Sequence, residues 1–404
     1  MKDAAIEFIQ KRFLLIIFLF VLLRILVAPL VWHPDVGNHV DWGARFYSYT
    51  PEKFYAPESN VWNFTWPNQP PGSIYIYAFV TKLYEIIFSI VWFLNVNISF
   101  FPSFVVPFFE QNFIYGMLKL PAIVADLLLA IAIFKITKSK VAPLVFLAIP
   151  SIWYNSSVWG QTDSIVNFFA FISIYLATKN KLFLSIFMFA ISLYIKLSMA
   201  IFAPILILVL LKKSLKKTVA YSLLVAALII LFSLPFSANK NPILWLRDIY
   251  LDRVLTEQMQ VVSANAFNFW GLLFGSKQES HYLTIFGFTY QLIGYVLFAS
   301  LWLVSVVIFY FSKNKHAVFS ILSLTALCSF MLMTNMHERY LYPMFAPIVV
   351  LAFYLKKIRV SLLILSIVNI VNLYNLWWVP DLGFLRVVLE LSLIHISEPT
   401  RQAE

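Results

Sequence analysis

Four side chains that can bind metal ions or transfer protons lie close together, directly after the first long apolar run of the chain. The stretch VWHPDVGNHVDWG, residues 31–43, contains His33, Asp35, His39 and Asp41. Imidazole nitrogens and carboxylate oxygens at these spacings are potential ligands of a divalent cation. A carboxylate here could instead act as a general base. The structural alternative is that Asp35, which follows Pro34, caps a helix beginning near Val36.

Two further motifs carry side chains that suit the binding of sugar hydroxyl groups. In WGQTDS, residues 159–164, Gln161 and Asp163 can form hydrogen bonds to hydroxyls, and Trp159 offers an aromatic face. The alternative for this motif is a helix cap formed by Asp163 or the next residue. In ANAFNFW, Asn265 and Asn268 either orient a substrate or satisfy the backbone of a turn.

Three cationic or titratable side chains are candidates for binding a phosphate. Arg339 and His337 lie in NMHERYLYP, and a guanidinium can bind two phosphate oxygens together. With Arg339 at the phosphate, Glu338 is expected to pair with it or to face water. The alternative is that Arg339 anchors a helix end at the lipid headgroups. Lys196, in YIKLSMAIFAP, either binds the same phosphate or extends towards the headgroups.

The composition of the chain indicates which elements must position these residues. Of the 404 residues, 61% are hydrophobic and 12% are charged, which excludes a soluble globular protein of ordinary surface. The net charge of +11 does not indicate nucleic-acid binding, because the basic residues lie at the ends of apolar segments. An all-α, polytopic bundle of transmembrane helices is therefore expected. Arg24 would be buried in the first span and needs a partner, for which Asp126 is a candidate.

Clusters of lysine and arginine indicate the orientation of the spans. We expect the clusters at 11–12, 135–140, 179–181, 212–217, 313–315 and 356–359 to lie on the cytoplasmic side. This assignment predicts about 11 spans, near residues 13–31, 115–135, 141–158, 162–178, 182–195, 197–212, 218–235, 283–311, 316–333, 340–355 and 360–379. It also makes residues 32–114 one external region, in which 72–94 forms an interfacial or re-entrant helix. The alternative is that 72–94 is an ordinary second span.

The order of these motifs resembles the GT-C glycosyltransferases, and most of all the dolichol-linked glucosyltransferases and the bacterial and archaeal relatives of glycosylphosphatidylinositol mannosyltransferases. The resemblance covers residues 13 to about 380. It depends on an Asp soon after the first span, a Pro-Pro stretch, KLPAIVADLLLAIAIFK, WGQTDS, the Asn-rich aromatic motif and HERYLYP. It implies a GT-C fold whose first external loop forms helices along the membrane. It also implies transfer of a hexose, mannose or glucose, from a polyprenyl-phosphate carrier to an acceptor hydroxyl on the outer face.

The resemblance suggests a role for each candidate residue. The family's catalytic acid follows the first span, so Asp35 is expected to be the general base of an inverting transfer, with Asp41 as a second candidate that contacts the acceptor. Arg339, His337 and Lys196 are expected at the donor phosphate, and the polar side chains of WGQTDS and ANAFNFW at the sugar or acceptor. No cofactor is expected, with a divalent cation as the alternative. The expected partners are the polyprenyl-phosphate-linked donor, a lipid-linked or polymeric acceptor, and membrane lipids.

The sequence also indicates the location of the protein and its domain organisation. We expect one integral domain over residues 1–391 in a prokaryotic plasma membrane, with its active site facing outside. The tail SLIHISEPTRQAE, 392–404, shares no pattern with the rest and resembles a translated sequencing adapter, so it is expected to be non-native. The rival functions are a lipid or sugar transporter or flippase, and a non-catalytic membrane assembly subunit.

Overall fold

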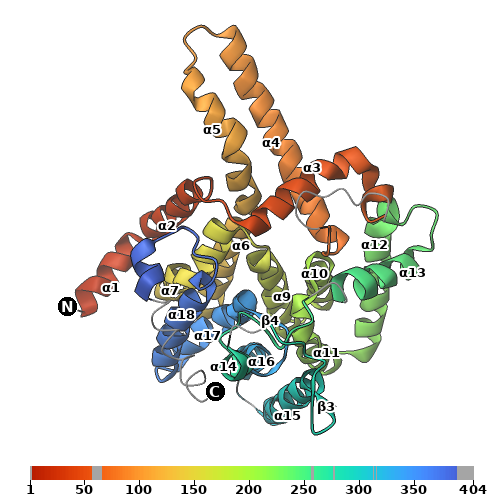
Figure 1. Ribbon diagram of the computed structural model, residues 1–404. Helices are drawn as coiled ribbons and strands as arrows, with labels where there is room; N and C mark the ends of the chain where they lie inside the picture. The colour runs from red at the N-terminus through yellow and green to blue at the C-terminus, as the bar shows by residue number, and fades with distance from the viewer. Residues whose placement is uncertain are drawn as a thin grey trace, which may run out of the picture. The chain divides into compact units, whose positions relative to one another are not determined.

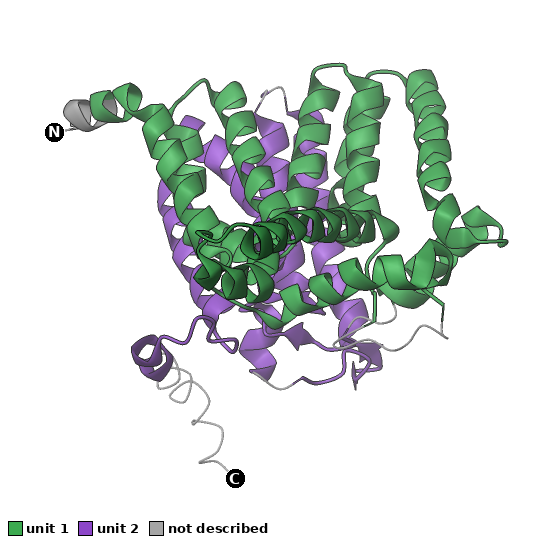
Figure 2. Ribbon diagram, turned by 90° about the horizontal axis from the view of Figure 1, so that it is seen from above, with its two compact units in different colours: residues 1–258 green, residues 259–404 purple. Residues whose placement is uncertain are grey.

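The computed structural model describes residues 2–56, 66–255, 259–275, 278–312, 314 and 316–388. These residues are predominantly helical, and the four strands among them have two residues each (Figure 1). The expectation of an all-α helical membrane protein is therefore confirmed. The chain divides into two compact units, residues 1–258 and 259–404 (Figure 2). The prediction for the tail, 392–404, lies outside the described residues.

The described residues of unit 1 are almost entirely helical. Its elements are α1 (Lys2–Lys11), α2 (Phe13–Val27), α3 (Pro34–Phe54), α4 (Pro71–Asn97), η2 (Ser103–Val105), α5 (Val106–Gln111), α6 (Phe113–Thr137), α7 (Val141–Ala148), α8 (Pro150–Trp153), η3 (Tyr154–Trp159), α9 (Asp163–Thr178), α10 (Leu182–Ile195), η4 (Leu197–Phe202), α11 (Ala203–Leu211), α12 (Leu215–Ser237), α13 (Pro242–Asp248) and η5 (Ile249–Leu255).

Unit 2 combines helices with two short strand pairs. Its elements are β1 (Ser263–Ala264), α14 (Phe269–Phe274), β2 (Thr284–Ile285), β3 (Phe288–Thr289), α15 (Tyr290–Phe311), α16 (Ala317–Leu332), β4 (Met336–His337), η6 (Glu338–Met344), α17 (Phe345–Tyr354) and α18 (Ile358–Tyr374). β1 pairs with β4 in parallel, and β2 pairs with β3 in antiparallel orientation.

Each of the eleven predicted spans overlaps a helical segment. Among the described residues, four helices are long and apolar enough to cross a membrane: α4, α6, α12 and α15. The pair α7 and α8–η3 passes the same test of length and composition only when its two parts are taken together, and it bends by 62° next to Pro150, where proline disrupts the helical hydrogen bonds. The count of about 11 spans stays a prediction. The predicted start at 283 is wrong, since the β2–β3 hairpin precedes α15.

The buried charges of the first two predicted crossings pair as expected. Arg24 Nε in α2 lies 3.9 Å from Asp126 Oδ2 in α6, and both side chains are almost completely buried. The guanidinium also donates to the carbonyl of Leu147 at 2.9 Å. A paired charge inside a helical bundle costs far less than an isolated one, so this contact allows α2 and α6 to pack together.

The first predicted external region is helical, and its two long helices pack closely. A Cβ on Gly43 of α3 would lie 2.8 Å from the backbone oxygen of Tyr77 in α4, so only glycine fits there. Trp42, Phe54 and Tyr77 belong to one buried apolar cluster, which also includes residues of α6 and α12. This packing fixes α3, which carries the opening motif, against α4. The location of both helices along the membrane stays a prediction.

Candidate active site

Asp35 lies in the first turn of α3. This helix begins at Pro34, a favourable first position because proline has no N–H to satisfy. His33 is the capping residue, and its Nδ1 accepts a hydrogen bond from the Asp35 backbone N–H at 3.2 Å. The alternative in which Asp35 caps the helix is therefore wrong. Its side chain is half-buried.

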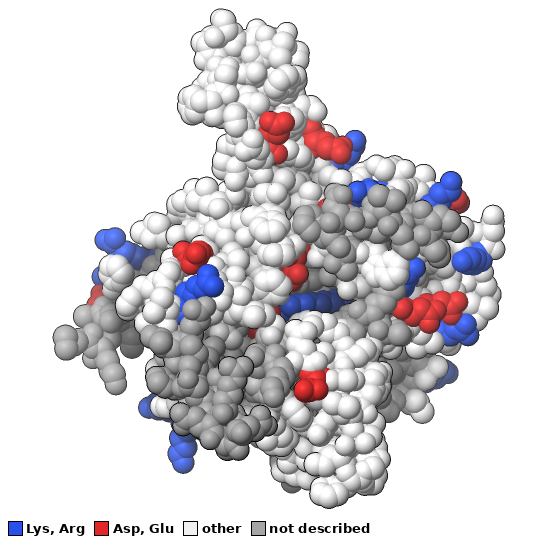
Figure 3. Space-filling model, in the orientation of Figure 1, with Lys and Arg blue, Asp and Glu red and all other residues white. Residues whose placement is uncertain are grey.

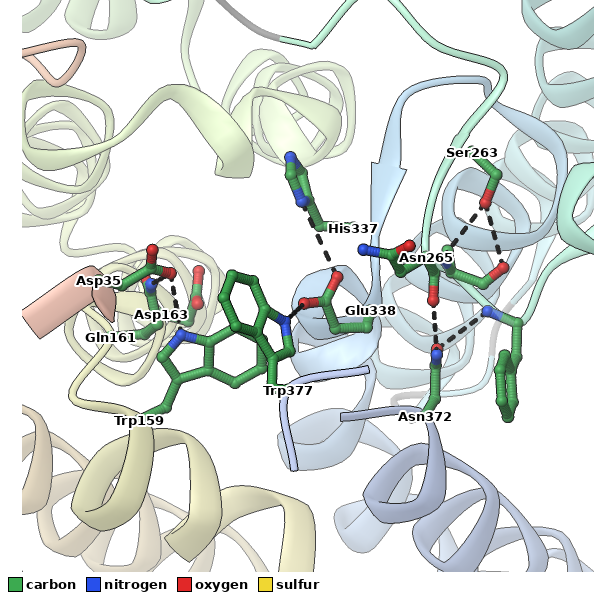
Figure 4. Close-up of polar contacts among 12 residues, drawn as sticks. Asp35, Trp159, Gln161, Asp163, Ser263, Asn265, His337, Glu338, Asn372 and Trp377 are labelled. Atoms are coloured by element: carbon green, nitrogen blue, oxygen red, sulfur yellow. Dashed lines mark hydrogen bonds and ion pairs between the residues drawn. The ribbon is translucent and has the colours of Figure 1, made fainter. Parts of the chain in front are cut away.

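Two side chains of the WGQTDS motif hold the Asp35 carboxylate. Trp159 Nε1 donates to Asp35 Oδ2 at 2.9 Å, and Gln161 Nε2 donates a short hydrogen bond to the same oxygen (Figure 4). Trp159 is fully buried and serves here as a hydrogen-bond donor, and the contact of its aromatic face with a sugar stays a prediction. Two donors from a distant segment fix the orientation of the carboxylate, as a catalytic base requires.

A tight turn places these two donors. η3 is a π-helical segment that ends at Gly160, whose φ is +82°, a conformation that glycine adopts at little cost. A Cβ at this position would lie 3.1 Å from both Val36 Cγ2 and Lys119 Cγ. Glycine thus allows the turn to approach α3 and α6, which brings Trp159 and Gln161 to Asp35.

Asp163 of the same motif forms a buried ion pair. Lys196 Nζ lies 2.8 Å from Asp163 Oδ1, and the two side chains are 11% and 4% exposed. Asp163 occupies the first turn of α9, where a carboxylate interacts favourably with the helix dipole, and the N-cap position itself is held by Thr162. Lys196 is extended between α10 and η4 and turns inward. Both alternatives from the sequence, a cap by Asp163 and extension of Lys196 to the headgroups, are therefore wrong.

Two buried amide oxygens near these residues lack hydrogen-bond donors within the described part of the chain. They are Gln161 Oε1 and Asn155 Oδ1, and their side chains are 3% and 0% exposed. The amide nitrogen of each side chain donates a hydrogen bond, from Gln161 to Asp35 and from Asn155 to Asp163. A buried acceptor without a donor is costly, so a ligand hydroxyl would find a favourable site here.

The Pro-Pro stretch, WPNQPPGSIYIY at residues 66–77, also contributes to this part of unit 1. Tyr77 donates to Gln69 Oε1 at 3.1 Å, and Tyr55 donates to the Gln69 backbone carbonyl at 2.7 Å. Burial raises the pKa of the Tyr55 hydroxyl well above its ordinary value, which extends the pH range over which it donates this hydrogen bond. A Cβ on Gly72 would lie 2.5 Å from the carbonyl oxygen of Tyr194, so the start of α4 packs tightly against the end of α10, close to Lys196.

The remaining residues of the opening stretch have other partners. Asp41 pairs with Arg45 at 2.6 Å, and this hydrogen bond raises the pKa of the Arg45 guanidinium. The His39 ring stacks on Tyr77 with ring centroids 4.3 Å apart. The four potential metal ligands thus do not converge, and the described residues contain no group of three His, Cys, Asp or Glu side chains placed to hold a metal ion.

Lys119 of α6 is a site residue that sequence reasoning missed. Its side chain is completely buried, and Nζ donates to the carbonyls of Ala28 at 2.9 Å and Val31 at 2.6 Å. These carbonyls lie between α2 and α3, directly before the Asp35 turn. The available signal was a lysine inside an apolar segment, because a charge at membrane depth requires a partner. Lys119 therefore fixes the chain that leads into α3.

Replacing Lys119 with methionine should destabilise the protein by about 1–3 kcal/mol, because the variant leaves buried carbonyls without a donor. Thermal unfolding of the purified protein in detergent measures this loss. The matched control is Lys135→Met in the same helix, where the lysine is exposed, and this change should leave the melting temperature nearly unaltered. Equal melting temperatures for the two variants would contradict the role given to Lys119.

In unit 2, the strand pair β1–β4 brings the ANAFNFW and HERYLYP motifs together. Ser263 pairs with Met336, and Ala264 pairs with His337. Glu338 is completely buried and accepts a hydrogen bond from Trp377 Nε1 at 2.8 Å, so the expectation that it faces water is wrong (Figure 4). Its Oε2 lies 3.8 Å from His337 Nδ1. The Arg339 guanidinium lies over the Tyr340 ring at 5.5 Å, and its contact with a donor phosphate stays a prediction.

The two asparagines of ANAFNFW support the backbone. Asn268 caps α14 by accepting from the Gly271 N–H at 2.8 Å, and its amide donates to the Phe330 carbonyl at 3.0 Å. Asn265 has a φ of +62°, and its carbonyl accepts a hydrogen bond from Asn372 at 2.7 Å. The alternative in which these residues satisfy a turn is confirmed for Asn268. Substrate contacts of either residue stay predictions.

No protein-family model matches the chain, and the search of curated proteins found no match.

Proposed function

We propose that the protein is a membrane glycosyltransferase that moves a hexose from a polyprenyl-phosphate carrier to an acceptor hydroxyl. One observation carries this proposal. The half-buried carboxylate of Asp35 is held by Trp159 and Gln161, beside the buried Asp163–Lys196 pair. Three segments far apart in the sequence thus contribute to one polar group of residues in an otherwise apolar bundle. This arrangement suits a base that acts on a hydroxyl next to bound sugar.

In the proposed reaction, Asp35 accepts the proton of the acceptor hydroxyl. At the same time, the oxygen of that hydroxyl forms a bond to the anomeric carbon of the hexose. The bond between that carbon and the phosphate oxygen breaks, and polyprenyl phosphate departs with the electron pair. Attack from the side opposite the phosphate inverts the anomeric centre. Trp159 and Gln161 orient the carboxylate that accepts this proton.

The neighbouring polar groups have complementary roles in this proposal. Gln161 Oε1 and Asn155 Oδ1 accept hydrogen bonds from ligand hydroxyls, which supplies the donors that these buried atoms lack among the described residues. The Lys196 ammonium offers positive charge to the phosphate, and its pairing with Asp163 keeps it in place when no donor is bound. The roles of Arg339 and His337 at the phosphate remain as proposed from the sequence.

The experiment supplies the full-length protein in lipid nanodiscs with radiolabelled polyprenyl-phosphate mannose or glucose and a panel of hydroxyl acceptors. The expected result is a new glycoside, formed from the carrier-linked hexose and not from a nucleotide sugar. A parallel assay in liposomes measures movement of the same lipid between leaflets. Lipid movement without glycoside formation would favour a flippase and would contradict the transferase proposal.

A further inference from the structure

A cavity of about 560 Å³ lies in unit 1 where α10 and α12 begin. Three lysines line this cavity: Lys181, directly before α10, and Lys213 and Lys217, at the start of α12. The lysines come from two loops that α10, η4 and α11 separate in the sequence, and all three are exposed. The fold thus brings three positive charges together around one cavity.

The lysines of this cavity have no acidic side chain near them in the sequence. Residues 164–247 contain no Asp or Glu, although the two loops together hold six lysines. Over the ranges that the structure describes, no ion pair involves any of the three cavity lysines. Several exposed charges elsewhere in unit 1 are paired, for example Lys82 with Glu85. Figure 3 shows other acidic side chains that lie beside basic ones. The cavity therefore has a net positive charge that a bound anion can neutralise.

The first turns of two helices add to this positive charge. Residues 182–184 form the first turn of α10 and line the cavity, and no side chain caps this end of the helix. The N–H groups of a first turn have no acceptor within the helix, so they can donate to an anion. Ser214 also lines the cavity and caps α12, where its Oγ accepts a hydrogen bond from the Lys217 N–H at 3.3 Å. The positive ends of both helix dipoles thus lie at the cavity.

Aromatic packing holds the two helix starts together. The rings of Phe183 in α10 and Tyr221 in α12 meet edge to face, with centroids 5.7 Å apart, and both residues line the cavity. Lys217 and Tyr221 are four residues apart, so they share one face of α12. The Tyr221 hydroxyl is a further possible donor to a ligand oxygen. The cavity is therefore formed by packed helices that carry cationic groups at fixed points of their backbones.

We propose that this cavity binds a phosphate monoester group. Lysine ammonium groups bind phosphate as point charges, and the N-termini of helices bind it through backbone N–H groups. A monoester carries about two negative charges at neutral pH, so it suits three lysines better than a phosphate diester or a carboxylate does. The group can belong to a lipid headgroup or to a soluble compound, because the lysine clusters predict that this end of the helices meets the cytoplasm.

The orientation of the spans does not by itself explain this arrangement. Lysines that only keep a loop on the cytoplasmic side need no common cavity. Lys212 and Lys216 belong to the same cluster in the sequence, yet neither lines the cavity. They offer a control in which the charge of the loop changes and the cavity does not. Asp35 and the side chains that hold it do not line the cavity either, so the proposal is independent of hexose transfer.

The test titrates the full-length protein, in phosphatidylcholine nanodiscs, with inorganic phosphate in a calorimeter. One double variant, Lys213→Gln with Lys217→Gln, removes two lysines of the cavity. The matched control, Lys212→Gln with Lys216→Gln, removes the same charge from the same loop outside it. We expect the cavity variant to bind phosphate at least roughly tenfold more weakly than the wild type, because it loses two charged donors. The control should bind phosphate as the wild type does.

A second titration distinguishes the two sources of the phosphate group. Nanodiscs that contain phosphatidic acid, a monoester lipid, are compared with nanodiscs of equal surface charge that contain phosphatidylglycerol, a diester lipid. If a lipid headgroup fills the cavity, phosphatidic acid should abolish the binding of inorganic phosphate, and phosphatidylglycerol should not. If the ligand is soluble, phosphate should bind equally well in both kinds of nanodisc.

Two results would overturn the proposal. The first is the absence of phosphate binding to the wild type in phosphatidylcholine. The second is an equal loss of binding in the two double variants at equal melting temperatures, since the lysines would then act only through the overall charge of the loop. The single variants Lys217→Gln and Lys216→Gln repeat this comparison with one charge removed. None of these measurements depends on glycosyl transfer.

Discussion

Replacing Asp35 with asparagine should lower the rate of hexose transfer by roughly 10²–10⁴-fold, the usual contribution of a positioned general base. The amide has nearly the same shape as the carboxylate but cannot accept the proton of the acceptor hydroxyl at neutral pH. Asparagine can still accept the hydrogen bonds from Trp159 and Gln161 through its oxygen. The variant should therefore fold and bind the donor with an affinity close to that of the wild type.

The matched control for this prediction is Asp41→Asn on the same helix. Asp41 pairs with Arg45 rather than with the WGQTDS motif, so its replacement should reduce transfer far less. The two variants are compared by initial rates with carrier-linked mannose or glucose, after equal melting temperatures have been established. A greater loss of transfer in Asp41→Asn would assign the base to Asp41, the second candidate from the sequence.

Breaking the Asp163–Lys196 pair should have the largest effect on stability. Either Asp163→Asn or Lys196→Met leaves one buried charge without its counterion, and removal of one partner from a buried pair typically costs about 3–5 kcal/mol. The double variant should be more stable than the sum of the two single losses predicts, because it leaves neither charge unpaired. Thermal unfolding of the four proteins in one detergent gives the coupling between the two residues.

A comparable but exposed pair provides the control. Lys82 and Glu85 have the same nitrogen–oxygen separation of 2.8 Å, yet their side chains are 55% and 45% exposed. Water screens their interaction, so Lys82→Met should change the melting temperature very little. Similar losses of melting temperature for the exposed and the buried pair would contradict this prediction. They would show that the burial of Asp163 and Lys196 does not determine how much stability is lost when the pair is broken.

The location of the helices could be predicted from the sequence because apolar segments of sufficient length have few alternatives in a membrane protein. The lysine clusters separated these segments well, and each of the eleven overlaps a helical segment. Local backbone features limited the accuracy of the boundaries. Pro150 bends the third predicted crossing, and the hairpin at Thr284–Thr289 displaces the start of α15.

Part of the candidate site was also predictable. Asp35, Gln161, Asp163 and Lys196 were all identified from their polar character at the ends of apolar segments, and unit 1 brings them together. Their pairing could not be predicted, since it depends on the π-helical turn that ends at Gly160 and on the tertiary packing around it.

Two side chains show where pattern reasoning fails. Trp159 was expected to offer an aromatic face to a sugar, and the structure shows a second feature: it is buried, and its Nε1 donates a hydrogen bond to Asp35. Glu338 is buried and accepts a hydrogen bond from Trp377, which contradicts the expectation that it faces water, whereas its pairing with Arg339 stays a prediction. In both cases the deciding contact is distant in sequence, and residue type alone carries no information about it.

The most direct test of the central claim is the formation of a glycoside by purified wild-type protein and Asp35→Asn, measured side by side with the same radiolabelled polyprenyl-phosphate hexose and acceptor. We expect the wild type to form a product with inverted anomeric configuration, and Asp35→Asn to form almost none while binding the labelled donor equally well. Equal product formation by the two proteins, with both folded, would contradict the account.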